Sequence, residues 1–248
     1  MSSCQVYTEE EVALIRKGGA VLRQCLDMIE KEVCIGITTA ELDAKAEEFI
    51  RSNGGEPGFK GYQGFPATLC TSVNEECVHG IPSERVLKEG DIISIDCGVI
   101  FEGLYTDACI TVPVGKISKD ASHLLDVTKG ALAAVIGIAK AGVRVGDLSA
   151  TIQKYAEDRG CVPVQSLTGH GVGRNLHEFP DIPNIGTMGT GAMIPAGCVI
   201  ALEPIFTLHD SHVVQRSDGW TLSVRDNGIS AHFEHTIVLL DETCEILA

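Results

Sequence analysis

The sequence contains ten cysteines but no C-x-x-C pair, the spacing typical of thiolate zinc sites and dithiol redox sites. Several of the cysteines fall in apolar stretches, where a reduced cysteine behaves as a small hydrophobic residue. We therefore expect reduced thiols in a reducing compartment, and neither a disulfide framework nor a structural zinc site.

Long apolar runs and an excess of basic residues are also missing. No run approaches the length needed to cross a bilayer, and the start MSSCQVYTEEEVALIRKGG does not have the form of a signal peptide. The 19 Lys and Arg residues are outnumbered by 34 Asp and Glu residues, which gives a net charge of −15. Because affinity for nucleic-acid phosphates needs clustered Lys and Arg, we expect a cytoplasmic protein that binds neither nucleic acid nor membrane.

The remaining composition is that of an ordinary globular protein. Apolar residues make up 44% of the 248 residues and charged residues 21%, which argues against disorder. A chain of this length can bury a sizeable core. We expect a single domain over residues 1–248, built as one large unit or as two fused halves.

Four carboxylates lie in stretches that should otherwise be buried. Asp96 lies in DIISIDCGV, Asp107 in LYTDACITV, Glu203 in CVIALEPIF and Glu234 in AHFEHTIVLL. Burying a carboxylate without a counter-charge costs several kcal/mol, and none of these runs contains Lys or Arg. The sequence therefore predicts a shared divalent metal, with His170 of GHGVG as a nitrogen ligand.

Two of these acids flank a predicted hairpin. The turn Glu102-Gly103 joins two runs rich in strand-forming residues, so residues whose numbers sum to 205 should face each other. Asp107 then opposes Gly98, and Asp96 leaves the same face one diagonal step away. A slip of one residue would put the two carboxylates on opposite faces.

Oxygen ligands with one imidazole favour Mn²⁺, Fe²⁺, Co²⁺ or Zn²⁺ in a dinuclear site. Two such ions, roughly 3.5–4 Å apart, lower the pKa of a water molecule and polarise a carbonyl group. The expected reaction class is metal-assisted hydrolysis. The strand residues His232 and His235 flank Glu234, and two interpretations are open for both: support of the metal ligands through hydrogen bonds, or packing within the strand, which is the simpler one.

The chain aligns with itself. Residues 36–50 match residues 142–156, and residues 90–96 match residues 197–203, at offsets of 106 and 107. This indicates two related halves, about 10–115 and 120–240, each with helices before strands, and hence an α+β fold. Helices are expected at about Leu14–Val33, Thr39–Arg51, Leu124–Ala139 and Val145–Arg159, with Thr38 and Glu41 forming a capping box.

The chain resembles the type I methionine aminopeptidases from about Glu9 to Leu247. The resemblance is carried by the segments NEECVHGIP (74–82), DIISIDCGVIFEGLYTDACITVPVG (91–115), TGHGVGRNLHEFP (168–180), ALEPIF (201–206) and AHFEHTIVL (231–239). It implies a pita-bread fold (creatinase/aminopeptidase-like), in which two pseudo-twofold halves form an antiparallel-rich sheet covered by helices. It also implies hydrolytic removal of the initiator methionine from nascent chains with a small second residue.

By position, the resemblance implies roles for individual residues. Asp96 would chelate one metal ion, Asp107 and Glu234 would bridge two, and His170 and Glu203 would complete the second. Glu203 is also a candidate acceptor for the proton of the water. His79 would lie beside the scissile bond, and His177 would contact the substrate carbonyl. The substrate pocket would comprise Phe59, Tyr62, Phe65, Cys70, His79, Leu176, His177 and Trp220, whose aromatic and sulfur-bearing side chains suit a thioether.

Some bacterial relatives carry Cys at the position of Phe59 and Phe at that of Leu176, so the shape of the pocket is left open. The physiological metal and any transient contact with the ribosome are open as well. Two alternatives remain. A proline-type aminopeptidase of the same fold usually has an additional N-terminal domain, whereas this chain starts almost at its first helix. A non-catalytic binding protein on this scaffold would be expected to have lost metal ligands.

Overall fold

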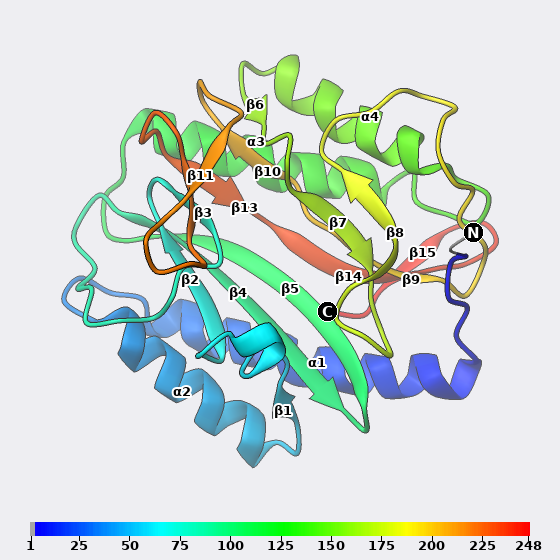
Figure 1. The fold of residues 1–248 in the computed structure, drawn as a ribbon, viewed down its shortest axis with the longest axis horizontal. Coiled ribbons are helices and arrows are strands. Elements are labelled where there is room, and N and C mark those ends of the chain that lie inside the picture. The colour runs from blue at the N-terminus through cyan, green and yellow to red at the C-terminus, as the bar shows by residue number, and fades with distance from the viewer. Residues whose placement is uncertain (1–2) are drawn as a thin grey trace.

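A computed structural model describes residues 3–248 of the chain (Figure 1). Within that range it contains four α-helices and one short 3-10 helix at Tyr62–Gly64. The α-helices are α1 (Glu9–Glu32), α2 (Thr39–Ser52), α3 (Lys119–Ile136) and α4 (Val145–Glu157).

Most of the strands belong to one large sheet, in which every pair of neighbours is antiparallel. Its main path runs β1-β4-β5-β14-β9-β7-β8, while β2 pairs with β4 and β15 pairs with β14. The bounds of these strands are β1 (Glu56–Pro57), β2 (Leu69–Val73), β4 (Ile92–Phe101), β5 (Leu104–Pro113), β7 (Thr168–Gly171), β8 (Glu178–Pro183), β9 (Val199–Leu202), β14 (Glu234–Leu239) and β15 (Cys244–Ile246).

Two smaller antiparallel sheets complete the strand structure. One has the order β13-β10-β6 and the other β11-β12-β3. Their strands are β3 (Glu76–Val78), β6 (Val162–Pro163), β10 (Ile205–Thr207), β11 (Val213–Gln215), β12 (Leu222–Val224) and β13 (Ser230–His232).

The helices cover the large sheet in two pairs. Figure 1 shows α1 and α2, in blue, beside the lower part of the sheet, and α3 and α4, in green, beside its upper part. Ile110 of β5 packs against both apolar clusters, so both pairs lie on the same face. The first pair buries Leu22, Leu26 and Ile50 in one apolar cluster with strand residues such as Ile93 and Val99. The second pair forms another cluster, whose buried residues include Leu124, Leu132, Leu148, Ile200 and Phe206. This apolar burial is the main favourable contribution to the stability of the fold.

The predicted capping box at Thr38 is confirmed: its hydroxyl accepts a hydrogen bond from the Glu41 backbone N–H, and the Glu41 carboxylate accepts one from the Thr38 backbone N–H. Several helix bounds were wrong. The first helix, expected from about Leu14, begins at Glu9, because the hydroxyl of Thr8 caps its start. The helix expected at Leu124–Ala139 spans Lys119–Ile136, because the hydroxyl of Ser118 caps its start and Gly137 follows its last turn. The helix expected to reach Arg159 ends at Glu157.

The hairpin of β4 and β5 has the predicted register. Glu102 and Gly103 form its turn, both with positive φ (49° and 79°), which is the geometry that a two-residue hairpin loop favours. Gly98 pairs with Asp107 and Asp96 with Cys109, so the two carboxylates share one face. In residues 3–248, no helix has the length and apolar character required to span a bilayer.

Candidate metal centre and substrate pocket

Five neighbouring strands bring the predicted metal ligands together. Asp96 lies on β4, Asp107 on β5, Glu234 at the start of β14 and His170 on β7, and Glu203 directly follows β9. The strand pairings set their relative positions: Glu234 pairs with Cys109, His235 with Leu202, and His170 with Ala201. Residues 138 positions apart in the chain thereby face one site.

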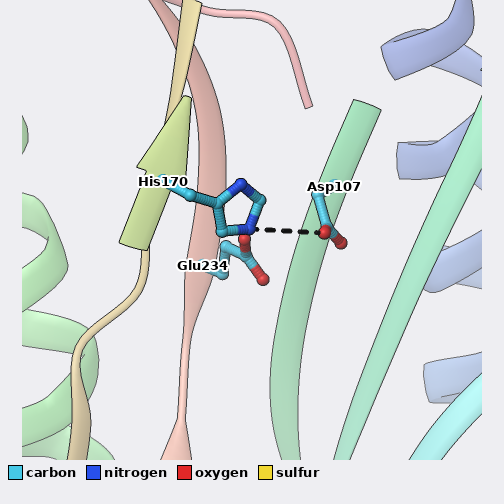
Figure 2. A group of neighbouring side chains, drawn as sticks. All are labelled: Asp107, His170 and Glu234. Atoms are coloured by element: carbon cyan, nitrogen blue, oxygen red, sulfur yellow. Dashed lines mark ion pairs between the residues drawn. The ribbon is translucent and has the colours of Figure 1, made fainter. Parts of the chain in front are cut away.

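The imidazole of His170 lies close to the carboxylates of Asp107 and Glu203. Its Nε2 atom is 3.9 Å from Asp107 Oδ2 and 3.7 Å from Glu203 Oε1. Figure 2 shows the His170 ring facing Asp107, with the Glu234 carboxylate beside it. Asp107, His170 and Glu234 each offer one ligand atom, and these atoms lie within 4.8 Å of one another. This spacing suits one shared cation.

Hydrogen bonds from the backbone orient two of these ligands. Nδ1 of His170 donates to the carbonyl of Gly171 at 2.9 Å, which leaves Nε2 of the neutral ring as the atom with a free lone pair. The hydroxyl of Thr236 donates to the carbonyl of Asp107 at 2.7 Å and accepts from its N–H at 2.9 Å. Thr236 thus joins β14 to β5 at the level of the carboxylates.

The acids are buried, and this changes their protonation. Asp107 is 4% exposed and Glu234 is 2% exposed. Burial raises the pKa of Asp96 to about 7. Burial and the charges of neighbouring carboxylates raise the pKa values of Asp107, Glu203 and Glu234 well above their usual range. The cluster therefore favours any cation that neutralises it.

A divalent metal fits the chemistry of this donor set. Asp96 Oδ1, Asp107 Oδ1 and Glu234 Oε1 are buried and have no hydrogen-bond partner among residues 3–248. Buried polar atoms in folded proteins almost always have a partner, so three bare carboxylate oxygens at one point indicate a ligand other than a side chain. Carboxylate oxygens with a neutral imidazole are ligands suited to several divalent transition metals.

The predicted metal ligands and the predicted substrate-pocket residues line the same cavity. Its volume is about 180 Å³. The predicted residues on its wall are Phe59, Tyr62, Phe65, Cys70, His79, Asp96, Asp107, His170, Leu176, His177, Glu203, Trp220 and Glu234. The carboxylates thus form one part of the wall, and aromatic and sulfur-bearing groups form another.

Gly98 makes room for one aromatic wall. A Cβ atom at Gly98 would lie 2.6 Å from the ring of Phe59, so a larger residue opposite Asp107 would displace that ring. Phe59, Phe65, Cys70 and Leu176 form one buried apolar cluster. Phe65 and Trp220 meet edge to face, with ring centroids 5.2 Å apart.

The two other predicted catalytic histidines occupy different edges of the cavity. His79 has a φ of 59°, an uncommon conformation for a residue other than glycine. Its ring is nearly perpendicular to that of Trp220, with ring centroids 6.4 Å apart. Burial lowers the pKa of His79 to about 4, so the ring is neutral near pH 7. Nδ1 of His177 lies 3.0 Å from the Tyr62 hydroxyl, and its ring centroid lies 4.3 Å from that of His170.

Three further residues line the cavity and were not predicted there: Gln63, Val78 and His232. Gln63 and Val78 lie next to predicted residues in the chain. His232 was expected to pack within its strand, but its Nε2 atom is 3.7 Å from Glu203 Oε2 and 3.6 Å from Glu234 Oε2. Its place two residues before Glu234 was a signal that alternation along an extended segment would put both side chains on one face.

Comparison with known proteins agrees with this arrangement. Residues 13–241 match the model of metallopeptidase family M24. A methionine aminopeptidase of Clostridium perfringens is 45% identical over 241 residues, which cover 96% of each chain. The crystal structure of a methionine aminopeptidase from Thermotoga maritima has a TM-score of 0.98 and 39% identity over 99% of both chains.

A prolidase from Pyrococcus furiosus shares the fold alone. It has a TM-score of 0.78 and is 21% identical, and the match covers 98% of this chain but 64% of the prolidase. These two structural matches confirm the predicted fold class. The family match also confirms the use of divalent metal. The chain therefore belongs to metallopeptidase family M24 and, within it, to the methionine aminopeptidases.

Proposed function

We propose that this chain removes the N-terminal methionine from polypeptides whose second residue is small, with two divalent metal ions as cofactors. The observation that carries the proposal is the shared cavity, in which buried carboxylates lie beside a mainly apolar wall. An N-terminal methionine side chain against that wall would place its peptide bond beside the acids.

Asp96, Asp107, His170, Glu203 and Glu234 would hold the metal ions. Asp96 would bind one ion, His170 and Glu203 the other, and Asp107 and Glu234 would bridge both. The distances of 3.7 and 3.9 Å from His170 Nε2 to Glu203 and Asp107 support one ion shared by these three residues, because they exceed hydrogen-bond length yet leave room for a cation between the atoms. Manganese, cobalt, iron(II) and zinc all suit these donors, and availability decides among them.

The chemistry then divides between the cofactor and the chain. Bound divalent ions would lower the pKa of a water molecule and polarise the scissile carbonyl. Glu203 would accept the proton of the water, because its raised pKa places it nearer to the pH of the reaction than an ordinary glutamate. His79, held neutral by burial, would hydrogen-bond at the scissile amide. His177 would donate to the carbonyl oxygen as charge develops there.

The apolar wall would select methionine. Phe59, Phe65 and Leu176 are nearly fully buried and offer an unbranched side chain a dry surface. The thiol of Cys70 and the ring of Trp220 would contact the thioether sulfur, which interacts favourably with aromatic edges. Tyr62 holds His177 by a hydrogen bond and so links this wall to the reacting end of the substrate.

The substrates we propose are nascent polypeptides in the cytoplasm. We propose that the enzyme acts as a monomer and contacts the ribosome at most transiently. All ten cysteines are free thiols, and most of them are buried, which fits a reducing compartment. The net charge of −15 disfavours contact with ribosomal RNA, so we propose that any contact with the ribosome involves its proteins.

The test is release of methionine from synthetic peptides by metal-free protein reconstituted with Mn²⁺ or Co²⁺. We expect rapid release from Met-Ala-Ser, slow release from Met-Leu-Ser, and none after chelation. Cleavage of an Ala-Pro-Ala peptide in place of Met-Ala-Ser would favour the proline-type alternative. Metal binding without release from any peptide would favour the non-catalytic alternative.

A further inference from the structure

His232 is a second histidine that reaches the metal centre, and it comes from the small sheet rather than the large one. It is the last residue of β13, is 2% exposed and lines the cavity. Its Nε2 atom approaches the Oε2 atoms of Glu203 and Glu234 at 3.7 and 3.6 Å. The ring thus spans two carboxylates that come from different strands.

Hydrogen bonds hold the backbone of His232, but among residues 3–248 none reaches its ring. The hydroxyl of Thr111 accepts a hydrogen bond of 2.9 Å from the His232 N–H and donates one of 2.7 Å to its carbonyl. Neither ring nitrogen has a hydrogen-bond partner among residues 3–248. Packing within the strand alone does not account for this ring. Burying two ring nitrogens without hydrogen bonds costs free energy, because both lose their hydrogen bonds to water and form none in the protein.

Glu203 lies between two imidazoles. His170 Nε2 approaches its Oε1 atom at 3.7 Å, and His232 Nε2 approaches its Oε2 atom at the same distance. The two rings differ in one respect: Nδ1 of His170 donates to the Gly171 carbonyl, which leaves its Nε2 free to bind a cation. A ring nitrogen of His170 also lies within 4.8 Å of ligand atoms of Asp107 and Glu234.

We infer that His232 is a positioning residue of the metal centre, whose Nε2–H group is directed at Glu203 and Glu234 and holds these two carboxylates towards the metal. This inference rests on the proposed function. It explains why a polar ring is buried at this point of β13. It also orients the Glu203 carboxylate, since Oε2 faces the His232 donor and Oε1 lies beside His170.

The experiment measures Mn²⁺ affinity of the metal-free full-length chain by titration calorimetry. His232→Ala removes the donor, and we expect affinity to fall by about tenfold or more, as for other groups that orient metal ligands. His232→Gln restores an N–H donor of similar reach, so affinity should return to within about threefold of wild type. His232→Asn offers the same amide on a shorter side chain and should behave like His232→Ala.

His123→Ala, on the exposed face of α3, is the control and should bind Mn²⁺ as wild type does.

Wild-type affinity in both His232→Ala and His232→Asn would overturn the inference. So would a loss in His232→Gln as large as that in His232→Ala, with one nitrogen ligand fewer in the X-ray absorption spectrum, because His232 would then be a ligand. Should His232→Ala not fold, the comparison of His232→Gln with His232→Asn decides. Absence of Mn²⁺ binding in the wild type would instead contradict the proposed function.

Discussion

The Tyr7 hydroxyl donates a hydrogen bond of 2.7 Å to Glu178 Oε2, across 171 positions of the chain. The same hydroxyl accepts one of 2.8 Å from the backbone N–H of Arg174, and Glu178 Oε1 accepts one of 2.9 Å from the backbone N–H of Asn175. These hydrogen bonds therefore join residues 173–178 to one another and to the N-terminal segment. Because this segment carries Leu176 and His177, Tyr7 holds the part of the cavity wall that, in the proposed function, would contact the substrate carbonyl.

Tyr7→Phe removes this hydroxyl and keeps the ring. We expect the free energy of unfolding to fall by roughly 1 kcal/mol, as for the loss of one or two hydrogen bonds. We expect kcat/KM for Met-Ala-Ser to fall by about tenfold, because His177 would be held less accurately. Tyr155→Phe, on α4, is the matched control and should leave kcat/KM unchanged. Equal kcat/KM values for the two variants would show that Tyr7 does not position this segment.

Glu203→Gln replaces the proposed metal ligand and proton acceptor with a neutral group of the same size. We expect kcat for Met-Ala-Ser to fall by about two to four orders of magnitude, the usual loss for a general base. The thermal unfolding temperature of the metal-free protein should not fall, since a buried carboxyl with a raised pKa has been replaced by an amide. Glu242→Gln, at a fully exposed position, serves as the control. A wild-type kcat in Glu203→Gln would exclude both roles.

The stability of the metal-free protein should fall as pH rises. The pKa of Asp96 in the folded protein is about 7, whereas the pKa of an Asp in the unfolded chain is about 3.9. The folded state thus holds a proton that the unfolded state releases, and stability is lost from pH 4 upwards through pH 7. Bound divalent metal removes this loss. The rise in unfolding temperature on adding Mn²⁺ should therefore be larger at pH 7.5 than at pH 5.5, and Asp96→Asn should reduce that difference. A larger rise at pH 5.5 would contradict this account.

His79→Ala separates catalysis from metal binding. Its ring lines the cavity beside Trp220, and no ion pair joins it to the carboxylates within residues 3–248. We expect kcat for Met-Ala-Ser to fall by about a hundredfold. Mn²⁺ affinity, measured by calorimetry, should stay within about threefold of wild type, unlike that of a variant lacking a ligand-orienting group. A loss of Mn²⁺ binding would assign His79 to the metal centre.

The features that were predicted correctly depend on residues close together in the chain. The capping box at Thr38 and the Glu102-Gly103 turn depend on residues within four positions of each other, and both were placed correctly. The carboxylates were found because a charge within an apolar strand has few explanations. The start of α3 was misplaced because apolar periodicity begins at Ala121 and Leu124, inside a helix whose cap is the polar Ser118.

The features that were missed depend on long-range packing. His232 belongs to β13, and only the pairing of β13 with β10, together with the Thr111 hydrogen bonds, turns its ring towards Glu203. The contact between Tyr7 and Glu178 likewise requires the N-terminal segment to pair at Val6 with Cys198. The place of His232 two residues before Glu234 indicated that both side chains share one face, but no pattern specified the approach of His232 to Glu203. For Tyr7 and Glu178, which lie 171 residues apart, no pattern within the sequence specified the contact.

The central claim is that acids from several strands hold a pair of divalent ions in the cavity. The most direct measurement is a crystal structure of the Mn²⁺-loaded protein with anomalous difference maps recorded at the manganese absorption edge. We predict two peaks roughly 3.5–4 Å apart, in contact with Asp96, Asp107, His170, Glu203 and Glu234. No peak within reach of these side chains, at saturating Mn²⁺, would contradict the account.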